Sequence, residues 1–507
     1  MTAFTGAERA AARPRLPATV QVSLVLCAIA FALAFVADLE IATLDPWFEL
    51  RRMARGLVTP DFLATEHLAR AVLYTVCFAL IGVAVGSMAG FVLALVFQYR
   101  IVRVGSAFVR AVHELFWALI FLQVFGLTPV TGVLAIAIPY AGIFAKVFAE
   151  ILEESDQSAL RTVAPGTGAV SVFMFARLPD ALAHFKTYTL YRLECGLRSS
   201  AVLGFVGLPT LGYHLESAFA QGKYSEVAAL LLIFYLVIST IKLWVRARLV
   251  PVYLLVAVFA LPWEGEIGFG NIVQFFTHDV LPHPLRVSGA LNPETFAALG
   301  AWTWDLLRTQ ALPGVLNTIV LTQIALVGSG ILTLLLFPLI SPKFFGRGGR
   351  TVGHVFLVVA RSTPEYVLTL VFLLLWGPSM LPAIVALSLH NGAIIGHLIG
   401  RYTEKMSMRP DRATGANLYF FEILPRVYGQ FLAFAFYRWE VIMRETAILG
   451  ILGVATLGFY IDSAFADLRF DRALLLILVT AFLNLGVDAL SRTIRARLKL
   501  RNSPDLI

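Results

Sequence analysis

Two stretches of this 507-residue chain match each other closely enough to decide how the whole is built. The first reads YRLECGLRSSAVLGFVGLPTLG from Tyr191 to Gly212, and the second reads YRWEVIMRETAILGILGVATLG from Tyr437 to Gly458. Arginine, glutamate and glycine recur at the same places in both stretches, which chance does not produce. The chain is therefore an internal duplication, with one copy of the same unit in each half.

Composition predicts a membrane protein. Hydrophobic residues make up 59% of the chain and charged residues 14%, and the mean hydropathy is +0.80. One soluble core does not hide that much apolar surface, so a large soluble enzyme is excluded. Stretches long enough to cross a bilayer core of ~30 Å are expected near 20–37, 71–97, 110–126, 129–149, 182–206, 226–244, 249–262, 313–340, 352–377, 380–400, 428–452 and 472–490.

We therefore predict an all-α polytopic membrane protein with about twelve transmembrane helices in two six-helix repeats. The first unit is expected at 1–248 with a core of about 71–245, and the second at 249–507 with a core of about 313–490. Because each unit holds an even number of helices, the copies should be parallel, related by an axis along the membrane normal. The segment 249–262 is short enough for a re-entrant element, but the duplication favours a short span.

Basic residues predict the topology, because Lys and Arg accumulate in short cytoplasmic loops. On this basis both termini are cytoplasmic, and the segments 38–70 and 263–312 lie outside. The first apolar run is longer than the ~7–15 residues of a signal peptide and is expected to stay as an anchor. The positive net charge of +8 is thus interpreted as a topology signal and not as a nucleic-acid site. The basic loop residues are Arg100, Arg103, Arg110, Lys242, Arg246, Arg248, Lys343, Arg347, Arg350 and the arginines of the C-terminal tail.

The duplicated stretch places charges inside apolar helices, where an ionised side chain costs at least ~2.5–3.5 kcal/mol. Glu194 and Arg198 are four residues apart and can pair on one helical face. Arg192 points about 160° away from Arg198 on a helical wheel; it is expected to stay unpaired and to line the substrate path, with a contact to another helix as the alternative. The pairs either clamp helices together or contribute to a cationic lining for an anion path. The same roles are predicted for Glu440, Arg444 and Arg438 in the second half.

Glycines follow the charges near the end of each duplicated helix. They permit close helix packing and a bend, and a helix end there can also offer N–H groups to an anion. We favour packing and a bend, with a gate as the functional alternative. The glycines concerned are Gly204, Gly207, Gly212, Gly450, Gly453 and Gly458.

A polar segment precedes each duplicated stretch, at about 150–180 and about 401–426. Each has acidic residues, a central glycine and a terminal Leu-Pro, and so resembles the coupling motif by which ABC importer permeases dock on an ATPase. A surface helix or an ordinary connecting loop is the alternative. The residues that carry this resemblance are Glu154, Gly166 (or Gly168), Leu178 and Pro179, and then Glu404, Gly415, Leu424 and Pro425.

The stretch from Tyr188 to Gly207 is similar to the fifth-helix signature of phosphonate ABC transporter permeases, and Tyr437 to Gly453 repeats it. The resemblance implies two fused permease units that import a small phosphorus oxyanion. It also implies two copies of a cytoplasmic ATPase, which binds ATP and Mg²⁺, and an external or periplasmic substrate-binding protein. The setting that it implies is the bilayer of a bacterial inner membrane.

The absence of several sequence motifs argues against classes of enzyme and of metal site. No GxxxxGK[ST] loop is present, so the chain is expected to bind no nucleotide itself and to be no enzyme. HExxH, GxSxG and Cys/His clusters are also missing, and neither a metal nor a cofactor is expected. The open alternatives are an ABC importer of phosphite, phosphate or an amino acid, and an ion-coupled secondary transporter with parallel repeats.

Overall fold

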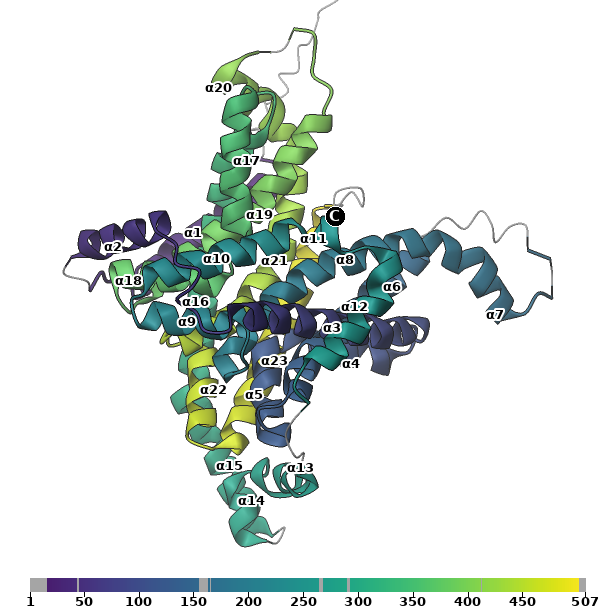
Figure 1. Ribbon diagram of the computed structural model, residues 1–507, viewed down its shortest axis with the longest axis vertical. Helices are drawn as coiled ribbons and strands as arrows, with labels where there is room; N and C mark the ends of the chain where they lie inside the picture. Colours follow the sequence, from purple (N-terminus) through teal and green to yellow (C-terminus); the bar gives the residue numbers. More distant parts are fainter. Residues whose placement is uncertain are drawn as a thin grey trace, which may run out of the picture.

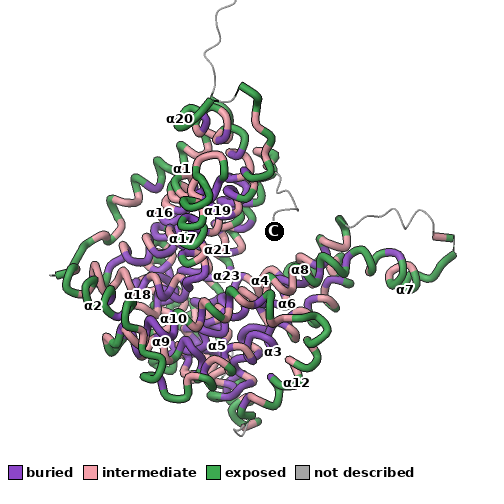
Figure 2. Tube along the Cα trace, turned by 45° about the horizontal axis from the view of Figure 1, so that its top comes forward, coloured by how far each residue is buried: buried purple, intermediate pink, exposed green. Residues whose placement is uncertain are grey.

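The computed structural model describes residues 16–42, 45–154, 163–164, 166–263, 268–289, 292–411 and 413–500. Over these residues the chain is helical and contains no β-strand, which confirms the all-α prediction. Buried stretches are concentrated in the centre of the molecule, and the outlying helices are largely exposed (Figure 2). The fold is therefore one helical assembly with several projecting elements (Figure 1).

The order of the principal helices is the same in the two halves. The first half contains α3 (Leu68–Leu95), α4 (Arg100–Ala111), α5 (Glu114–Phe125), α6 (Pro129–Glu154), α8 (Leu178–Val202), α9 (Leu211–Ala220) and α10 (Tyr224–Ser239). The second half contains α16 (Leu312–Leu336), α17 (Arg347–Ser362), α18 (Glu365–Trp376), α19 (Met380–Lys405), α21 (Leu424–Ile451), α22 (Leu457–Ala466) and α23 (Phe470–Arg497). Tight packing of α3 on α6 is matched by that of α16 on α19.

Shorter elements connect and extend these helices. In the first half they are α1 (Ala18–Ala34), α2 (Pro46–Val58), α7 (Ala169–Val172), the π-helical turn η2 (Phe173–Arg177), η3 (Leu203–Val206) and α11 (Ile241–Trp244). Between the halves lie η4 (Ala247–Leu249), α12 (Val250–Ala260), α13 (Phe269–Gln274), η5 (Phe275–Asp279), α14 (His283–Ser288), α15 (Pro293–Leu306) and η6 (Leu307–Ala311). The second half adds η7 (Phe337–Ile340), α20 (Gly415–Asn417) and η8 (Leu418–Ile423).

Five helices in the described residues are long and apolar enough to cross a membrane, or seven if each of two bent pairs forms one span. The predicted number of twelve is therefore not confirmed. Three further predicted spans correspond to the shorter apolar helices α1, α10 and α12. The fifth helices α8 and α21 are long enough but carry several charges, which explains why length and apolarity alone do not select them.

The predicted spans at 110–126 and 352–377 are each interrupted by a sharp bend. The chain turns by 91° between α4 and α5 and by 96° between α17 and α18. In the second half Pro364 follows extended Thr363, and a residue before proline is disfavoured in a helix. In the first half Val112 is extended, and the ring nitrogen of His113 accepts the backbone N–H of Leu115 to start a new helix.

The two halves exchange their outer helices. Helix α1 packs against α16 of the second half. Tyr428 of α21 also donates a hydrogen bond to Ser23 of α1. In the reverse direction α12 packs against α3 of the first half. Backbone hydrogen bonds from Ala42 to Trp376 and from Met380 to Asp38 add a further connection. Each half is therefore held by segments from the other.

Close backbone packing explains four of the duplicated glycines. A Cβ atom on Gly212 would overlap the carbonyl oxygen of Ala201, and one on Gly458 would overlap that of Ala447. A Cβ atom on Gly204 or Gly450 would likewise overlap the backbone of the following helix. The remaining two, Gly207 at φ 88° and Gly453 at φ 92°, adopt the left-handed conformation that turns the chain. These contacts favour the packing-and-bend interpretation, and a gating role stays a prediction.

We predict that Gly212→Ala destabilises the protein by about 1–3 kcal/mol, because the added methyl group forces two backbones apart. The midpoint of thermal unfolding, measured on purified chain in detergent, should fall. Gly105→Ala in α4 is the matched control, since a Cβ atom there meets open space. Equal midpoints for the two variants would contradict the proposed contact.

Candidate functional site

The fifth helices carry the duplicated charges into the packed part of the molecule. Helix α8 contacts α3, α6 and α9, and helix α21 contacts α16, α19, α22 and α23. Each begins with Leu-Pro directly after a π-helical turn. Helical structure continues through each proline, and the π-helical turn accommodates the backbone N–H that proline lacks.

Arg198 and Arg444 each cap a helix of the opposite half. Arg198 Nη1 donates to the carbonyl oxygen of Arg361 at 3.3 Å, and Arg444 Nη1 donates to that of Arg110 at 3.0 Å. Arg361 and Arg110 lie in the last turns of α17 and α4, where carbonyl groups lack helical partners. A cation also interacts favourably with a helix C-terminus. The two contacts are equivalent under the internal duplication.

The expected pairing of Glu440 with Arg444 is wrong. Glu440 instead lies 3.2 Å from Nη1 of Arg110, whose Nη2 is 2.7 Å from Asp488. Asp488 is also 3.1 Å from Arg492, so the group is an alternating network of charges. Packing of α4 against α23 is the physical reason, because it brings Arg110 next to Asp488 and Glu440.

The expected pair of Glu194 with Arg198 is not formed either. Besides its contact with Arg361, Arg198 donates to the sulfur of Cys195 at 3.6 Å. Within the described residues Glu194 forms no ion pair. Arg198 still interacts electrostatically with Glu194, but its hydrogen bonds go to the carbonyl oxygen of Arg361 and the sulfur of Cys195.

Arg192 lies among tyrosines. Its Nε donates to the hydroxyl of Tyr188 at 2.8 Å. The guanidinium carbon lies 5.3 to 5.9 Å from the ring centroids of Tyr140, Tyr188 and Tyr191. Among the residues that the structure describes it forms no ion pair, as predicted for this position.

Arg438, the equivalent residue, differs. Its Nε donates to Asn391 at 2.6 Å, and its Nη2 lies 3.4 Å from a carboxylate oxygen of Glu445. Asn391 also donates to the other oxygen of Glu445 at 3.1 Å. The expectation that Arg438 stays unpaired is therefore wrong, because the second half has a carboxylate where the first half has Ser199.

Two glutamates at the helix breaks belong to the same region. Glu114 accepts a hydrogen bond from Ser199 at 2.8 Å, and Ser199 also lies 3.3 Å from the hydroxyl of Tyr140. Glu365 lies 3.8 Å from His390. Neither glutamate was singled out from the sequence as a candidate site residue. The feature that could have identified them is that each is the first residue of a helix, where a negative charge is favourable.

One group of side chains has the spacing of a metal site. Single ligand atoms of Glu365, His390 and Glu445 all lie within 4.8 Å of one another. Both oxygens of Glu445 already interact with Arg438 and Asn391, however. A cation bound there would compete with the guanidinium, so the arrangement is better explained as a polar network between α18, α19 and α21.

The short helices α7 and α20, which belong to the predicted coupling segments, lie at the ends of two projecting arms (Figure 1). Glu154 ends α6 and Glu404 lies in the last turn of α19, and both are exposed. Gly166 has φ 90° and Gly415 has φ 61°, and a Cβ atom on either would meet open space. Residues 155–162, 165 and 412 of these segments lie outside the described residues. Docking stays a prediction.

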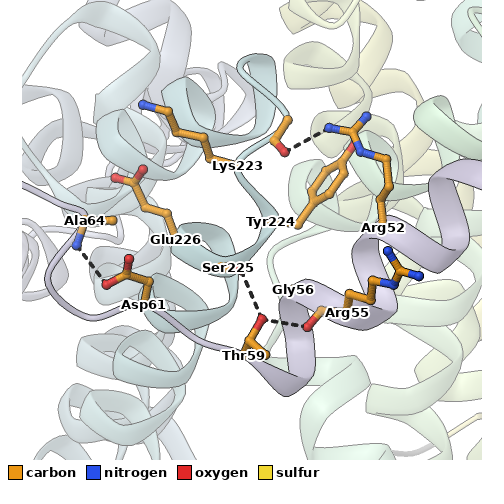
Figure 3. A pocket seen from close by; sticks show the side chains of 11 residues that line it. Arg52, Arg55, Gly56, Thr59, Asp61, Ala64, Lys223, Tyr224, Ser225 and Glu226 are labelled. Atoms are coloured by element: carbon orange, nitrogen blue, oxygen red, sulfur yellow. Dashed lines mark hydrogen bonds between the residues drawn. The ribbon is translucent and has the colours of Figure 1, made fainter.

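A polar pocket of about 430 Å³ lies apart from these charges, between α2 and the start of α10 (Figure 3). Arg52 stacks over the ring of Tyr224 at 5.1 Å and donates to the carbonyl oxygen of Gly222 at 3.3 Å. Thr59 lies 3.2 Å from the hydroxyl of Ser225. The pocket joins the first predicted external segment to the bundle, and none of the predicted site residues lines it.

Long apolar helices, buried charges and duplicated order define a multi-pass integral membrane protein. The chain is similar to the phosphate-import permease protein of Mycolicibacterium smegmatis, with 25% identity over 422 residues that cover 78% of both chains. It is 28% identical over 232 residues to the phosphite transport system permease protein PtxC of Stutzerimonas stutzeri, covering 44% of this chain and 84% of that one.

A putative cryptic phosphonate transport system permease protein of Escherichia coli is 26% identical over 107 residues, which are 21% of this chain and 88% of that one. No family model and no solved structure matches. The resemblance to phosphonate transport permeases is confirmed, because these curated relatives are permeases of phosphate, phosphite and phosphonate transport.

We predict that Arg110→Gln destabilises the protein by about 3–5 kcal/mol, because Glu440 and Asp488 lose their shared partner while buried. The measurement is the yield and thermal midpoint of purified chain. Arg103→Gln, at an exposed arginine of the same helix, should leave both unchanged. If Arg110→Gln matched that control, the network would not stabilise the fold. Adding Glu440→Gln and Asp488→Asn to Arg110→Gln should restore part of the loss.

Proposed function

We propose that this chain is the permease of an ABC importer that carries a phosphorus oxyanion into the cytoplasm by alternating access. The observation that carries the proposal is the coincidence of duplicated cationic fifth helices with relatives named for phosphate, phosphite and phosphonate transport. An anion crossing a low-dielectric region needs positive potential along its path. Arg192 of α8, which forms no ion pair among the described residues, is the arginine best placed to supply it.

Two permease units in one chain are supported by the extent of the alignments. The phosphite permease aligns over most of its own length but less than half of this chain. The phosphate-import permease aligns over equal shares of both chains. Contacts exchanged between halves, such as Arg198 with Arg361 and Arg444 with Arg110, fit two units that act as one transmembrane body.

The partners follow from this function. Two copies of a cytoplasmic ATPase, which bind ATP and Mg²⁺, would dock on the projecting segments around Gly166 and Gly415. A substrate-binding protein would deliver the anion on the opposite side, where α2 and the segment α13–α15 lie. The setting is the inner membrane of a bacterium, with both termini cytoplasmic. The chain itself needs no cofactor.

Other importer substrates, such as an amino acid, have less support because of the relatives' names. An ion-coupled carrier would have no need of two matching polar segments ending in Leu-Pro. The oxyanions phosphate, phosphite and phosphonate share a tetrahedral shape and negative charge, so the proposal is made for that class.

The direct test is uptake by proteoliposomes that contain this chain, its ATPase and its binding protein. We expect accumulation of labelled phosphate, phosphite or a phosphonate that requires ATP and the binding protein. The control omits the ATPase and imposes an ion gradient. Accumulation driven by that gradient without ATPase would overturn the ABC proposal.

A paired variant tests the coupling segments. We predict that Gly166→Asp with Gly415→Asp leaves the chain inserted but lowers co-purification of the ATPase. A charged side chain would enter a docking contact at two positions that already have positive φ. Gly300→Asp, at an uncrowded glycine of α15, is the control. Wild-type recovery of the ATPase with the double variant would count against docking there.

A further inference from the structure

We propose that the two halves do not share the anion equally, and that the substrate binds at Arg192 in the first half while Arg438 serves as a structural counter-charge. The inference rests on the proposed function and deepens it. It concerns where a tetrahedral oxyanion is held as it passes between α8 and α21.

The guanidinium group of Arg192 has hydrogen-bond donors that it does not use. Its Nε binds Tyr188, and within the described residues no hydrogen bond is made by either terminal nitrogen. Neither terminal nitrogen is among the fully buried donors that lack a partner in the described residues. A planar guanidinium with two free terminal nitrogens can bind two oxygens of one oxyanion side by side.

The tyrosines around Arg192 complete a site without adding negative charge. Tyr188 accepts from the guanidinium and keeps its own hydroxyl proton available for an anion. The rings of Tyr140 and Tyr191 hold the guanidinium in place by cation–π contact. Hydroxyls and one cation suit a transporter, because a site that binds too tightly does not release its substrate.

Arg438 lacks that capacity. Glu445 lies 3.4 Å from its Nη2, and Asn391 occupies its Nε at 2.6 Å. In the matched positions the first half has Ser199 in place of Glu445 and Tyr140 in place of Asn391. Two residue differences therefore convert the free cation of one half into the neutralised pair of the other.

Two tyrosines near Arg192 are partly exposed. Tyr191 is 41% exposed and its counterpart Tyr437 is 43% exposed, although both lie in central helices. Tyr437 of the second half also interacts electrostatically with Arg192 and Tyr191. Part-exposed tyrosines of both fifth helices therefore lie in the surroundings of Arg192.

The test uses the intact chain in lipid nanodiscs with inorganic phosphate as the probe, followed by ³¹P NMR line broadening. We expect wild-type protein to broaden the phosphate signal in a saturable manner. Arg192→Gln should weaken binding at least about tenfold, as loss of charged hydrogen bonds implies, and Arg192→Lys should keep part of it. The matched control is Arg438→Gln with Glu445→Gln, which removes a neutral pair and should bind like wild type.

Each outcome bears on the proposal. Absence of saturable binding by wild type, or equal losses in Arg192→Gln and in the paired control, would overturn the asymmetric site. Size-exclusion chromatography distinguishes lost binding from lost folding, because folded Arg192→Gln should elute at the wild-type position. If Arg192→Gln does not fold, Arg192→Lys must show the intermediate affinity. Failure of ATP-driven uptake with phosphate binding intact would instead remove the proposed function and leave the site.

Discussion

The structure depends on which side chains donate hydrogen bonds to the free backbone carbonyl groups where two helices break inside the bundle. A bend of more than 90° after α4 and after α17 leaves carbonyl groups at two helix ends within an apolar region, and unsatisfied backbone groups there cost several kcal/mol each. Arg198 and Arg444 supply the donors, and each comes from the half opposite to the helix that it caps. The same contacts that stabilise the breaks therefore join the halves.

The charged residues near these helix breaks are balanced differently in the two halves. Arg110 is neutralised by Glu440 and Asp488 from the second half. Where the second half has Asp488, the first half has Lys242 in the matched position, and an equivalent network is not possible. A single fused chain permits such divergence, whereas two identical subunits would carry the same side chains at both positions. The unpaired Arg192 and the paired Arg438 follow from this freedom.

Much of the architecture was predictable from the duplication, including helical order and the close packing at Gly204 and Gly212. The ion pairs were not, because four-residue spacing identifies partners only on an isolated helix. In a bundle, side chains of neighbouring helices compete, and Arg110 pairs with Glu440 and Asp488 through helix packing that hydropathy does not show. Pro364 could have signalled one break, but His113 carries no comparable signal. The predicted coupling and path residues keep their roles as proposals, since their partners are separate molecules.

The central claim is that Arg198 and Arg444 hold the two halves together through capped helix ends. The most direct measurement is the free energy of unfolding of the purified chain for Arg198→Gln, Arg444→Gln and Arg103→Gln. The account predicts losses of about 1.5–3 kcal/mol for each of the first two, as expected for hydrogen bonds to charged groups, and no loss for the third. Stability unchanged in both capping variants would contradict it.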